Sequence, residues 1–152
     1  MAARKVTGRK RHVVVDSAGH LLAVAVDTAD MSDAEGARWV LGRARAAWPE
    51  LVKGWADQTY RGTLVSWAQQ TYGLELEIVQ RPAAAKGFVL LPRRWVVERS
   101  LAWLGRARRL SKEYEHHPDN TELVIYLASS YLLLRRLYPP ITGDRPYLRK
   151  TG

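Results

Sequence analysis

The chain has no cysteine, and this absence excludes both a disulfide framework and a thiolate metal site. It also has no long apolar run, because the longest one, residues 123–134, contains two serines and is too short to span a bilayer. The basic residues 4–11 lead only into a brief apolar run before Asp16, so the N-terminus lacks the apolar region of a secretory signal. We therefore expect a soluble cytoplasmic protein that makes no membrane contact.

Acidic residues are scarce relative to basic ones. The 15 Asp and Glu stand against 24 Lys and Arg, which gives a formal net charge of +9 and an isoelectric point near 10.2. The basic residues cluster in segments 4–11, 93–99 and 106–112. A clustered surplus of this kind favours a polyanionic partner, and nucleic acid is the foremost candidate.

The apolar periodicity predicts eight elements in a single domain. With 152 residues and 47% apolar content, the chain is long enough to bury one ordinary core. Alternating and β-branched runs predict strands and helical spacing predicts helices, in the order β-β-α-β-α-β-α-α. The predicted strands are residues 12–15, 21–26, 51–56 and 74–79, and the predicted helices are residues 31–48, 62–72, 93–104 and 118–138. We expect a mixed α/β architecture with helices packed on a sheet.

Several side chains mark the ends and faces of the predicted helices. Ser32 or Asp33 caps the first helix, and Gly73 closes the second. Asp119 and Glu122 stand three apart, as in a capping box at the start of the last helix. The apolar stripe that predicts the packing face of this helix is Leu123, Tyr126, Leu127, Ser130, Leu134 and Leu137.

Two carboxylates stand among residues where a charge is costly. Asp57 ends the strand that contains Trp55, at the carboxyl end where open α/β sheets usually place ligands. Glu98 lies on a helix built from bulky apolar residues and arginines. A carboxylate in such surroundings needs a cation, either a neighbouring arginine or a divalent ion. On residue types alone the simpler interpretations stay open: Asp57 is then a turn or cap residue, and Glu98 a surface group paired with the flanking arginines.

Three segments occur together: Trp-Ala-Asp-x-x-Tyr-x-Gly at 55–62, Arg-Arg-Trp-Val-Val-Glu-Arg-Ser-Leu-Ala-Trp-Leu at 93–104, and a hairpin that begins Gly-Arg-Lys-Arg-His at residue 8. In combination they resemble the C-terminal part of the DDE transposases of bacterial insertion sequences. The resemblance covers residues 8–138, and residues 139–152 are left as a polar, flexible tail. It implies an RNase H-like fold, a mixed sheet with flanking helices, whose N-terminal strand is expected to be missing here.

The resemblance also implies a chemistry. Such enzymes hold two Mg²⁺ or Mn²⁺ ions with Asp, Asp and Glu, and they cleave and transfer DNA strands at transposon ends. Asp57 matches the second Asp and Glu98 the Glu, so both are expected to be catalytic metal ligands. The first Asp belongs to the strand before the hairpin and is expected to be absent. Asp16 is favoured as a turn residue rather than its replacement, and so are Asp27 and Asp30.

The basic residues near the last two helices are the expected DNA contacts, namely Arg94, Arg99, Arg106, Arg108, Arg109 and Lys112. Trp95 and Trp103 are expected in the core, and His116 and His117 in a loop. Two functions stay open. The first is an active transposase that acts on transposon ends and target DNA. The second is an inactive DNA-binding or regulatory fragment, which pairs with full-length transposase or with itself.

Overall fold

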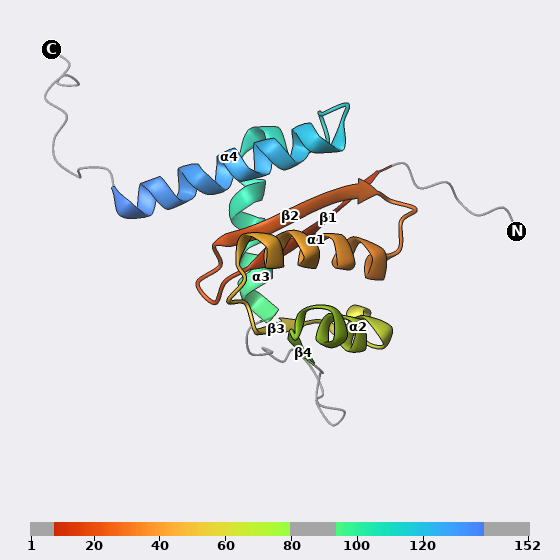
Figure 1. Ribbon diagram of the computed structural model, residues 1–152. Helices are drawn as coiled ribbons and strands as arrows, with labels where there is room; N and C mark the ends of the chain where they lie inside the picture. The colour runs from red at the N-terminus through yellow and green to blue at the C-terminus, as the bar shows by residue number, and fades with distance from the viewer. Residues whose placement is uncertain (1–7, 80–93, 139–152) are drawn as a thin grey trace, which may run out of the picture.

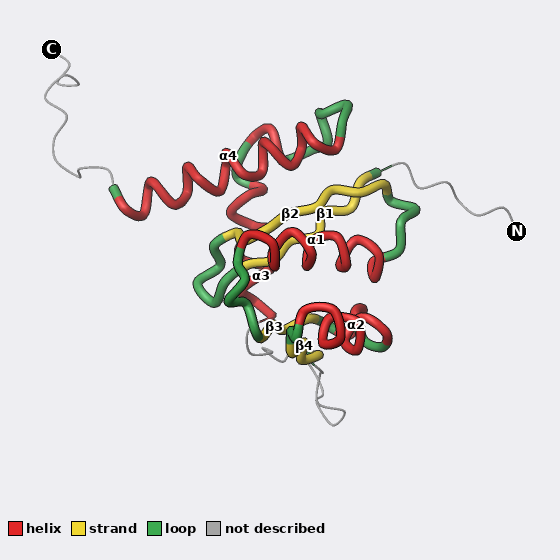
Figure 2. Tube along the Cα trace, in the orientation of Figure 1, coloured by secondary structure: helices red, strands yellow, loops and turns green. Residues whose placement is uncertain are grey.

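The computed structural model describes residues 8–79 and 94–138 and folds them as mixed α/β (Figure 1, Figure 2). The strands are β1 (Arg9–Val15), β2 (Leu21–Thr28), β3 (Lys53–Ala56) and β4 (Glu75–Ile78). The helices are α1 (Asp33–Ala47), α2 (Thr63–Tyr72), α3 (Arg94–Gly105) and α4 (Pro118–Leu137), with short 3-10 helices η1 (Gln58–Tyr60) and η2 (Arg108–Leu110). This confirms the predicted order of elements. The predicted tail at 139–152 lies outside the described residues.

β1 and β2 form an antiparallel hairpin, and successive side chains of β2 point to opposite faces. Ala23 and Ala25 pack against α1. Val24 and Val26 point the other way and pack against residues of α3, η2 and α4. The hairpin is therefore the middle layer, with α1 on one face and the C-terminal helices on the other (Figure 1).

β3 and β4 form a second pair, which is parallel and sets Trp55 opposite Glu77. Within the described residues the strands make two separate two-stranded sheets. The single mixed sheet expected from the sequence is not formed there, because β1 pairs only with β2 and β3 only with β4 among these strands. The mixed α/β class is nevertheless confirmed.

α1 connects the two sheets. Its N-cap Ser32 accepts a hydrogen bond from the amide of Glu35 at 3.2 Å, which confirms the predicted start of the helix. Ala44 packs against the hairpin. Ala37 and Leu41 belong to a different apolar cluster, which α1 shares with α2 and β4. Figure 1 accordingly shows α1 between the hairpin and α2.

The predicted capping box of α4 is wrong. The N-cap of α4 is His117, whose side chain makes no capping hydrogen bond, and Pro118 opens the helix. Glu122 instead accepts hydrogen bonds from the amide of Val26 at 2.9 Å and from Arg43 at 2.6 Å. Its carboxylate turns toward β2 because a strand amide and a guanidinium compete for it more strongly than the N-terminal amides of its own helix.

The outer edge of β2 is covered by side chains. Besides Glu122, the hydroxyl of Tyr126 accepts a hydrogen bond from the amide of Val24 at 3.3 Å, and Arg43 donates to the carbonyl of Val24 at 2.8 Å. Backbone groups at a sheet edge need such partners when they are removed from water. The opposite edge of the hairpin, on β1, has no strand partner among the described residues.

The predicted packing face of α4 is also wrong. The buried residues of this helix are Thr121 and Ile125, which lie on the side opposite the predicted stripe. Leu123 and Leu127, within the stripe, are 58% and 61% exposed. No helix within residues 8–79 and 94–138 is both long enough and apolar enough to cross a membrane.

Candidate active site

Asp57 follows β3 directly and caps η1. Its carboxylate accepts a hydrogen bond from the amide of Thr59 at 2.9 Å, and the residue is half-buried. This bond satisfies an amide that the short helix leaves without an internal partner. Asp57 thus lies at the end of its strand as predicted, and one oxygen of its carboxylate stabilises the turn.

Tyr60 ties the Asp57 turn to the hairpin. Its hydroxyl lies 3.5 Å from Nδ1 of His12 on β1. Burial raises the pKa of Tyr60, and the negative charges of Asp33 and Asp57 raise it further. The spacing in the sequence did not reveal this contact, because residues 12 and 60 meet only through tertiary packing.

His12 and Asp27 form a buried pair beneath α1. Their side chains are 4% and 3% exposed, and Nε2 of His12 lies 3.8 Å from Oδ2 of Asp27. Neither of these two atoms has a hydrogen-bond partner within the described part of the chain. Burial lowers the pKa of His12, against the opposing effect of the Asp27 charge. The predicted turn role of Asp27 is wrong, because this residue lies within β2 and faces the interior.

Glu98 lies on the second turn of α3 and is exposed. The buried residues Val96 and Ser100 lie two positions to either side, on the opposite face of the helix. The hydroxyl of Ser100 donates to the carbonyl of Gly19 at 2.8 Å, which fixes α3 against the hairpin turn. The buried face therefore orients the helix and leaves Glu98 on its outer side.

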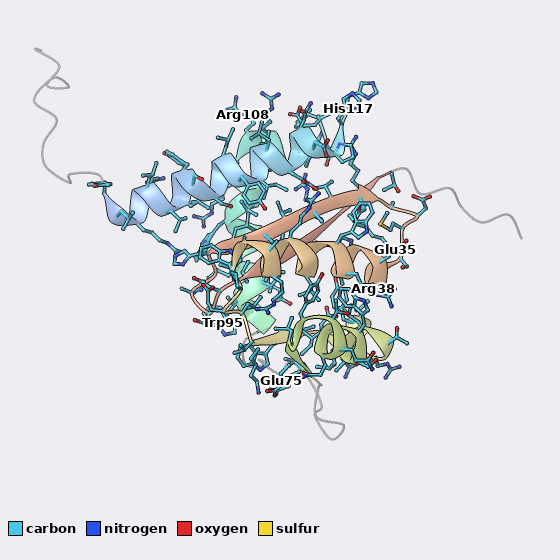
Figure 3. The ribbon with its side chains drawn as sticks, in the orientation of Figure 1. Glu35, Arg38, Glu75, Trp95, Arg108 and His117 are labelled. Atoms are coloured by element: carbon cyan, nitrogen blue, oxygen red, sulfur yellow. The ribbon has the colours of Figure 1, made fainter. Side chains whose placement is uncertain are left out.

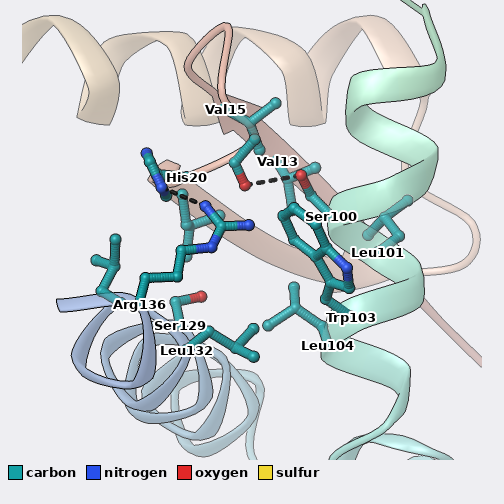
Figure 4. Close-up of a pocket in the computed structure, with 13 residues that line it drawn as sticks. Val13, Val15, His20, Ser100, Leu101, Trp103, Leu104, Ser129, Leu132 and Arg136 are labelled. Carbon is teal, nitrogen blue, oxygen red and sulfur yellow. Dashed lines mark hydrogen bonds between the residues drawn. The ribbon is translucent and has the colours of Figure 1, made fainter. Parts of the chain in front are cut away.

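Arg99 is held between two tryptophans of α3. Its guanidinium carbon lies 4.3 Å from the ring centroid of Trp95 and 4.6 Å from that of Trp103, and it donates to the carbonyl of Ala18 at 2.8 Å. Arg136 of α4 stacks on Trp103, and both side chains line a pocket between the hairpin, α3 and α4 (Figure 4). The core position predicted for Trp95 is wrong, since this side chain is 40% exposed and packs on a cation.

The basic segment that follows α3 divides into paired and exposed residues. Arg109 forms an ion pair with Glu115 at 2.6 Å. Arg106, Arg108 and Lys112 are exposed, and the described part of the chain supplies no carboxylate to pair with them. Figure 3 places Arg108 beside α4, on the far side of the molecule from Glu75.

These exposed cations lie at one end of α3 and Glu98 near the other. Arg106 follows Glu98 by eight residues, or about 12 Å along a helix axis. Arg94 opens α3, but its side chain lies outside the described residues. His116 and His117 are in the loop before α4, as predicted.

A protein family described as the transposase DDE domain matches residues 2–133. The chain belongs to the DDE transposase family. No curated protein and no solved structure matches it. The matched residues of this transposase include Asp57, Glu98 and every described strand. The family implies a DNA substrate and generally uses a divalent metal.

The carboxylates of the transposase are of the kind that binds such a metal, but too few of them lie together in the described part of the chain to form a complete site. Aspartate and glutamate oxygens are the ligands that Mg²⁺ and Mn²⁺ prefer. Among the residues that the structure describes, however, no three His, Asp or Glu side chains gather closely enough to hold a metal ion. Both carboxylate oxygens of Asp16 are engaged by its turn: Oδ1 accepts from the amides of Ala18 and His20 at 2.9 and 2.8 Å, and Oδ2 contacts Nδ1 of His20 at 2.8 Å.

Proposed function

We propose that this chain is part of a transposase catalytic domain that cleaves and transfers DNA strands at transposon ends, with Asp57 and Glu98 as two of its metal-binding carboxylates. The observation that carries the proposal is the family match over residues 2–133. Two positions agree with it: Asp57 is at the carboxyl end of β3, and Glu98 is exposed on α3. Both carboxylates belong to the segments that carry the family pattern.

A bound Mg²⁺ or Mn²⁺ supplies Lewis acidity at the scissile phosphate and lowers the pKa of the attacking water or hydroxyl. The chain's own residues contribute the oxygen ligands and the scaffold that holds them. The 2.9 Å bond to Thr59 limits rotation of the Asp57 carboxylate. The bond between Ser100 and Gly19 limits rotation of α3, and therefore movement of Glu98.

In this proposal the remaining carboxylate lies outside the described residues, on an additional strand. A strand inserted between β1 and β3 would join the two sheets into one RNase H-like mixed sheet. Two features support this position. The outer edge of β2 is covered by Glu122, Tyr126 and Arg43, whereas β1 has no described strand partner on its other edge. In addition, α1 packs on both sheets and so holds them on either side of such a strand.

The cations proposed to bind DNA are those that are exposed and unpaired within the described part of the chain. Arg106, Arg108 and Lys112 are exposed and bind backbone phosphates, and Arg94, which precedes Glu98 by four residues in the sequence, acts as an electrostatic support. Arg99 already packs on two tryptophans, and Arg109 is paired with Glu115. Their proposed role is therefore to position α3 and η2 rather than to bind phosphate.

One observation favours a second function. Within the described residues no group of three potential ligands exists. A chain that lacks the third carboxylate would still bind DNA through its cations but would not cleave it. The second candidate is therefore a non-catalytic DNA-binding or regulatory protein.

The experiment incubates the full chain with Mn²⁺ and supercoiled plasmid DNA that carries the transposon ends, and measures nicking together with gel retardation. The active protein should nick this DNA, and the D57N and E98Q variants should lose roughly 100-fold or more of the rate while they still bind. E75Q, on β4, is the matched control because Glu75 is a highly exposed glutamate outside the proposed site. Retardation without nicking by the wild-type chain supports the second function, and loss of both contradicts the two proposals.

A further inference from the structure

α4 has two opposite apolar faces, and the described part of the chain covers only one of them. Thr121 and Ile125 are 1% exposed; Ile125 packs with Val124 and Ala128 against the hairpin layer, and the hydroxyl of Thr121 accepts a hydrogen bond from Arg9 of β1 at 3.2 Å. The other face, together with Tyr138 directly after the helix, carries six large apolar side chains that are each 55–77% exposed: Leu123, Leu127, Tyr131, Leu134, Leu137 and Tyr138. In Figure 1 the C-terminal half of α4 extends past the end of the hairpin.

The size of the exposed face indicates a macromolecular partner. Side chains of this kind have on the order of 150–200 Å² of accessible surface each, so their exposed fractions leave roughly 600–750 Å² of apolar area. A monomer rarely exposes a larger patch, and a standard protein interface buries about 800 Å² from each partner. A helix that is apolar on both sides is normally covered on both sides.

The spacing of the face fits a second helix of the same kind. Leu123, Leu127, Ser130, Leu134 and Leu137 follow one another at intervals of four, three, four and three residues, which is the seam of a helix pair. Ser130, at the middle, is small and exposed. A two-fold axis at Ser130 would set Leu123 of one chain opposite Leu137 of the other, and the seam would therefore complement itself.

The charges at the ends of α4 select the direction of the pairing. The first turn carries Asp119, and the last turn carries Arg135 and Arg136. A parallel pair would place like charges and like helix ends together. An antiparallel pair places the acidic end of each helix toward the basic end of the other, and it also opposes the two helix dipoles.

We propose that the exposed face of α4 is a homodimer interface, in which two copies of this chain pair antiparallel about Ser130. The exposure, spacing and charge of α4 favour this interface whether or not Asp57 and Glu98 bind a metal, because none of the α4 residues concerned belongs to the proposed catalytic site.

Engineered cysteines test both the contact and its direction, and the natural absence of cysteine removes any background. Under mild oxidation S130C should crosslink to itself, because a disulfide requires Cα atoms within about 7 Å. L123C and L137C should each stay uncrosslinked alone and should crosslink when mixed. V52C, at a residue that is 66% exposed elsewhere on the surface, is the control for random collision.

A second measurement keeps the test independent of crosslinking. Sedimentation equilibrium of the wild-type chain should show a dimer, and the double variant L127E-L134E should raise its dissociation constant by about 100-fold or more, at roughly tenfold for each 1.4 kcal/mol. V52E should leave that constant unchanged. Far-UV circular dichroism should be the same for all three proteins, because each replaced residue is at least 55% exposed.

Three results would overturn the proposal. The first is a wild-type chain that stays monomeric at every concentration up to roughly 100 µM, well above the micromolar range of weak specific pairs. The second is self-crosslinking of both L123C and L137C, which would indicate a parallel pair. The third is a dimer that L127E-L134E leaves as tight as the wild type, which would place the interface elsewhere.

Discussion

Replacement of Glu122 by alanine is expected to destabilise the fold much more than removal of a surface ion pair of similar length. The Glu122 side chain is only 13% exposed and accepts hydrogen bonds from the amide of Val26 at 2.9 Å and from Arg43 at 2.6 Å. Alanine would leave the amide of Val26, a residue that is 4% exposed, without a partner.

The magnitude follows from these two contacts. An unsatisfied buried amide costs about 1–3 kcal/mol. Arg43 is 44% exposed, so loss of its ion pair adds only about 0.5–1 kcal/mol. We expect E122A to lower the free energy of unfolding by about 1.5–4 kcal/mol. The variant E122Q keeps an oxygen that accepts from Val26, and it should lose only about 1 kcal/mol.

Urea unfolding followed by tryptophan fluorescence measures these differences, and the six tryptophans supply the signal. All variants are compared at one protein concentration, because dimerisation would make stability depend on concentration. E75A is the matched control: Glu75 pairs with Lys53 at 2.7 Å but is 64% exposed, so this change should cost less than about 1 kcal/mol. The reasoning is refuted if E122A and E75A lose the same amount, or if E122Q is as unstable as E122A.

Three further predictions concern other parts of the molecule. G36A should lower stability by about 1–3 kcal/mol despite the better helix propensity of alanine, because the added Cβ would come within 2.7 Å of Cε1 of His12. Stability should also fall as the pH drops below 6.5, since burial lowers the pKa of His12 from this value and only the unfolded chain then takes up the proton. The contribution is complete above pH 6.5 and is lost as the pH falls through the folded pKa, and thermal unfolding of H12Q should lack this dependence. Finally, joint replacement of Arg106, Arg108 and Lys112 by alanine should weaken DNA binding and reduce its log–log salt slope by about 0.9 for each phosphate that the protein no longer neutralises.

Each of these predictions has its own control. The effect of G36A should become neutral or favourable in an H12A background, where the ring is absent, and a loss that persists there would contradict the steric account. A pH slope between 6.5 and 5 that H12Q retains would assign the titration to another group. For DNA binding the control is K53A, because Lys53 is already paired with Glu75 at 2.7 Å and Glu77 at 3.3 Å. An equal change in salt slope for K53A would contradict the assignment of the phosphate contacts to Arg106, Arg108 and Lys112.

Local patterns predicted the elements well where the signal lies within one segment. Ser32 caps α1, and Gly73 closes α2 in the left-handed conformation with φ of 62°, because these roles depend on the residue and its nearest backbone neighbours. The turn role of Asp16 was predictable for the same reason. The family, too, could be recognised from three short segments, and the match over residues 2–133 confirms it.

Predictions failed where two distant segments compete for one side chain. Glu122 has the spacing of a capping box, yet it bonds to β2 and α1, because Val26 and Arg43 reach it only in the folded chain. Trp95 is a different case: Arg99 follows it by four residues on the same helix, so this pairing is local, but which face of α3 is buried depends on its contact with the hairpin. The partners of Glu122 could not be read from the sequence, since Val26 and Arg43 are not fixed by local spacing.

What the sequence alone determined is the order of strands and helices and the family, because the apolar periodicity and the short motifs that indicate them are local patterns. Tertiary structure alone decided which of the two apolar faces of α4 is buried, that the four described strands pair as two separate sheets, and which cations remain exposed. These depend on contacts between segments up to about a hundred residues apart, such as Glu122 with Val26. Only packing can choose among partners that the linear pattern presents as equivalent.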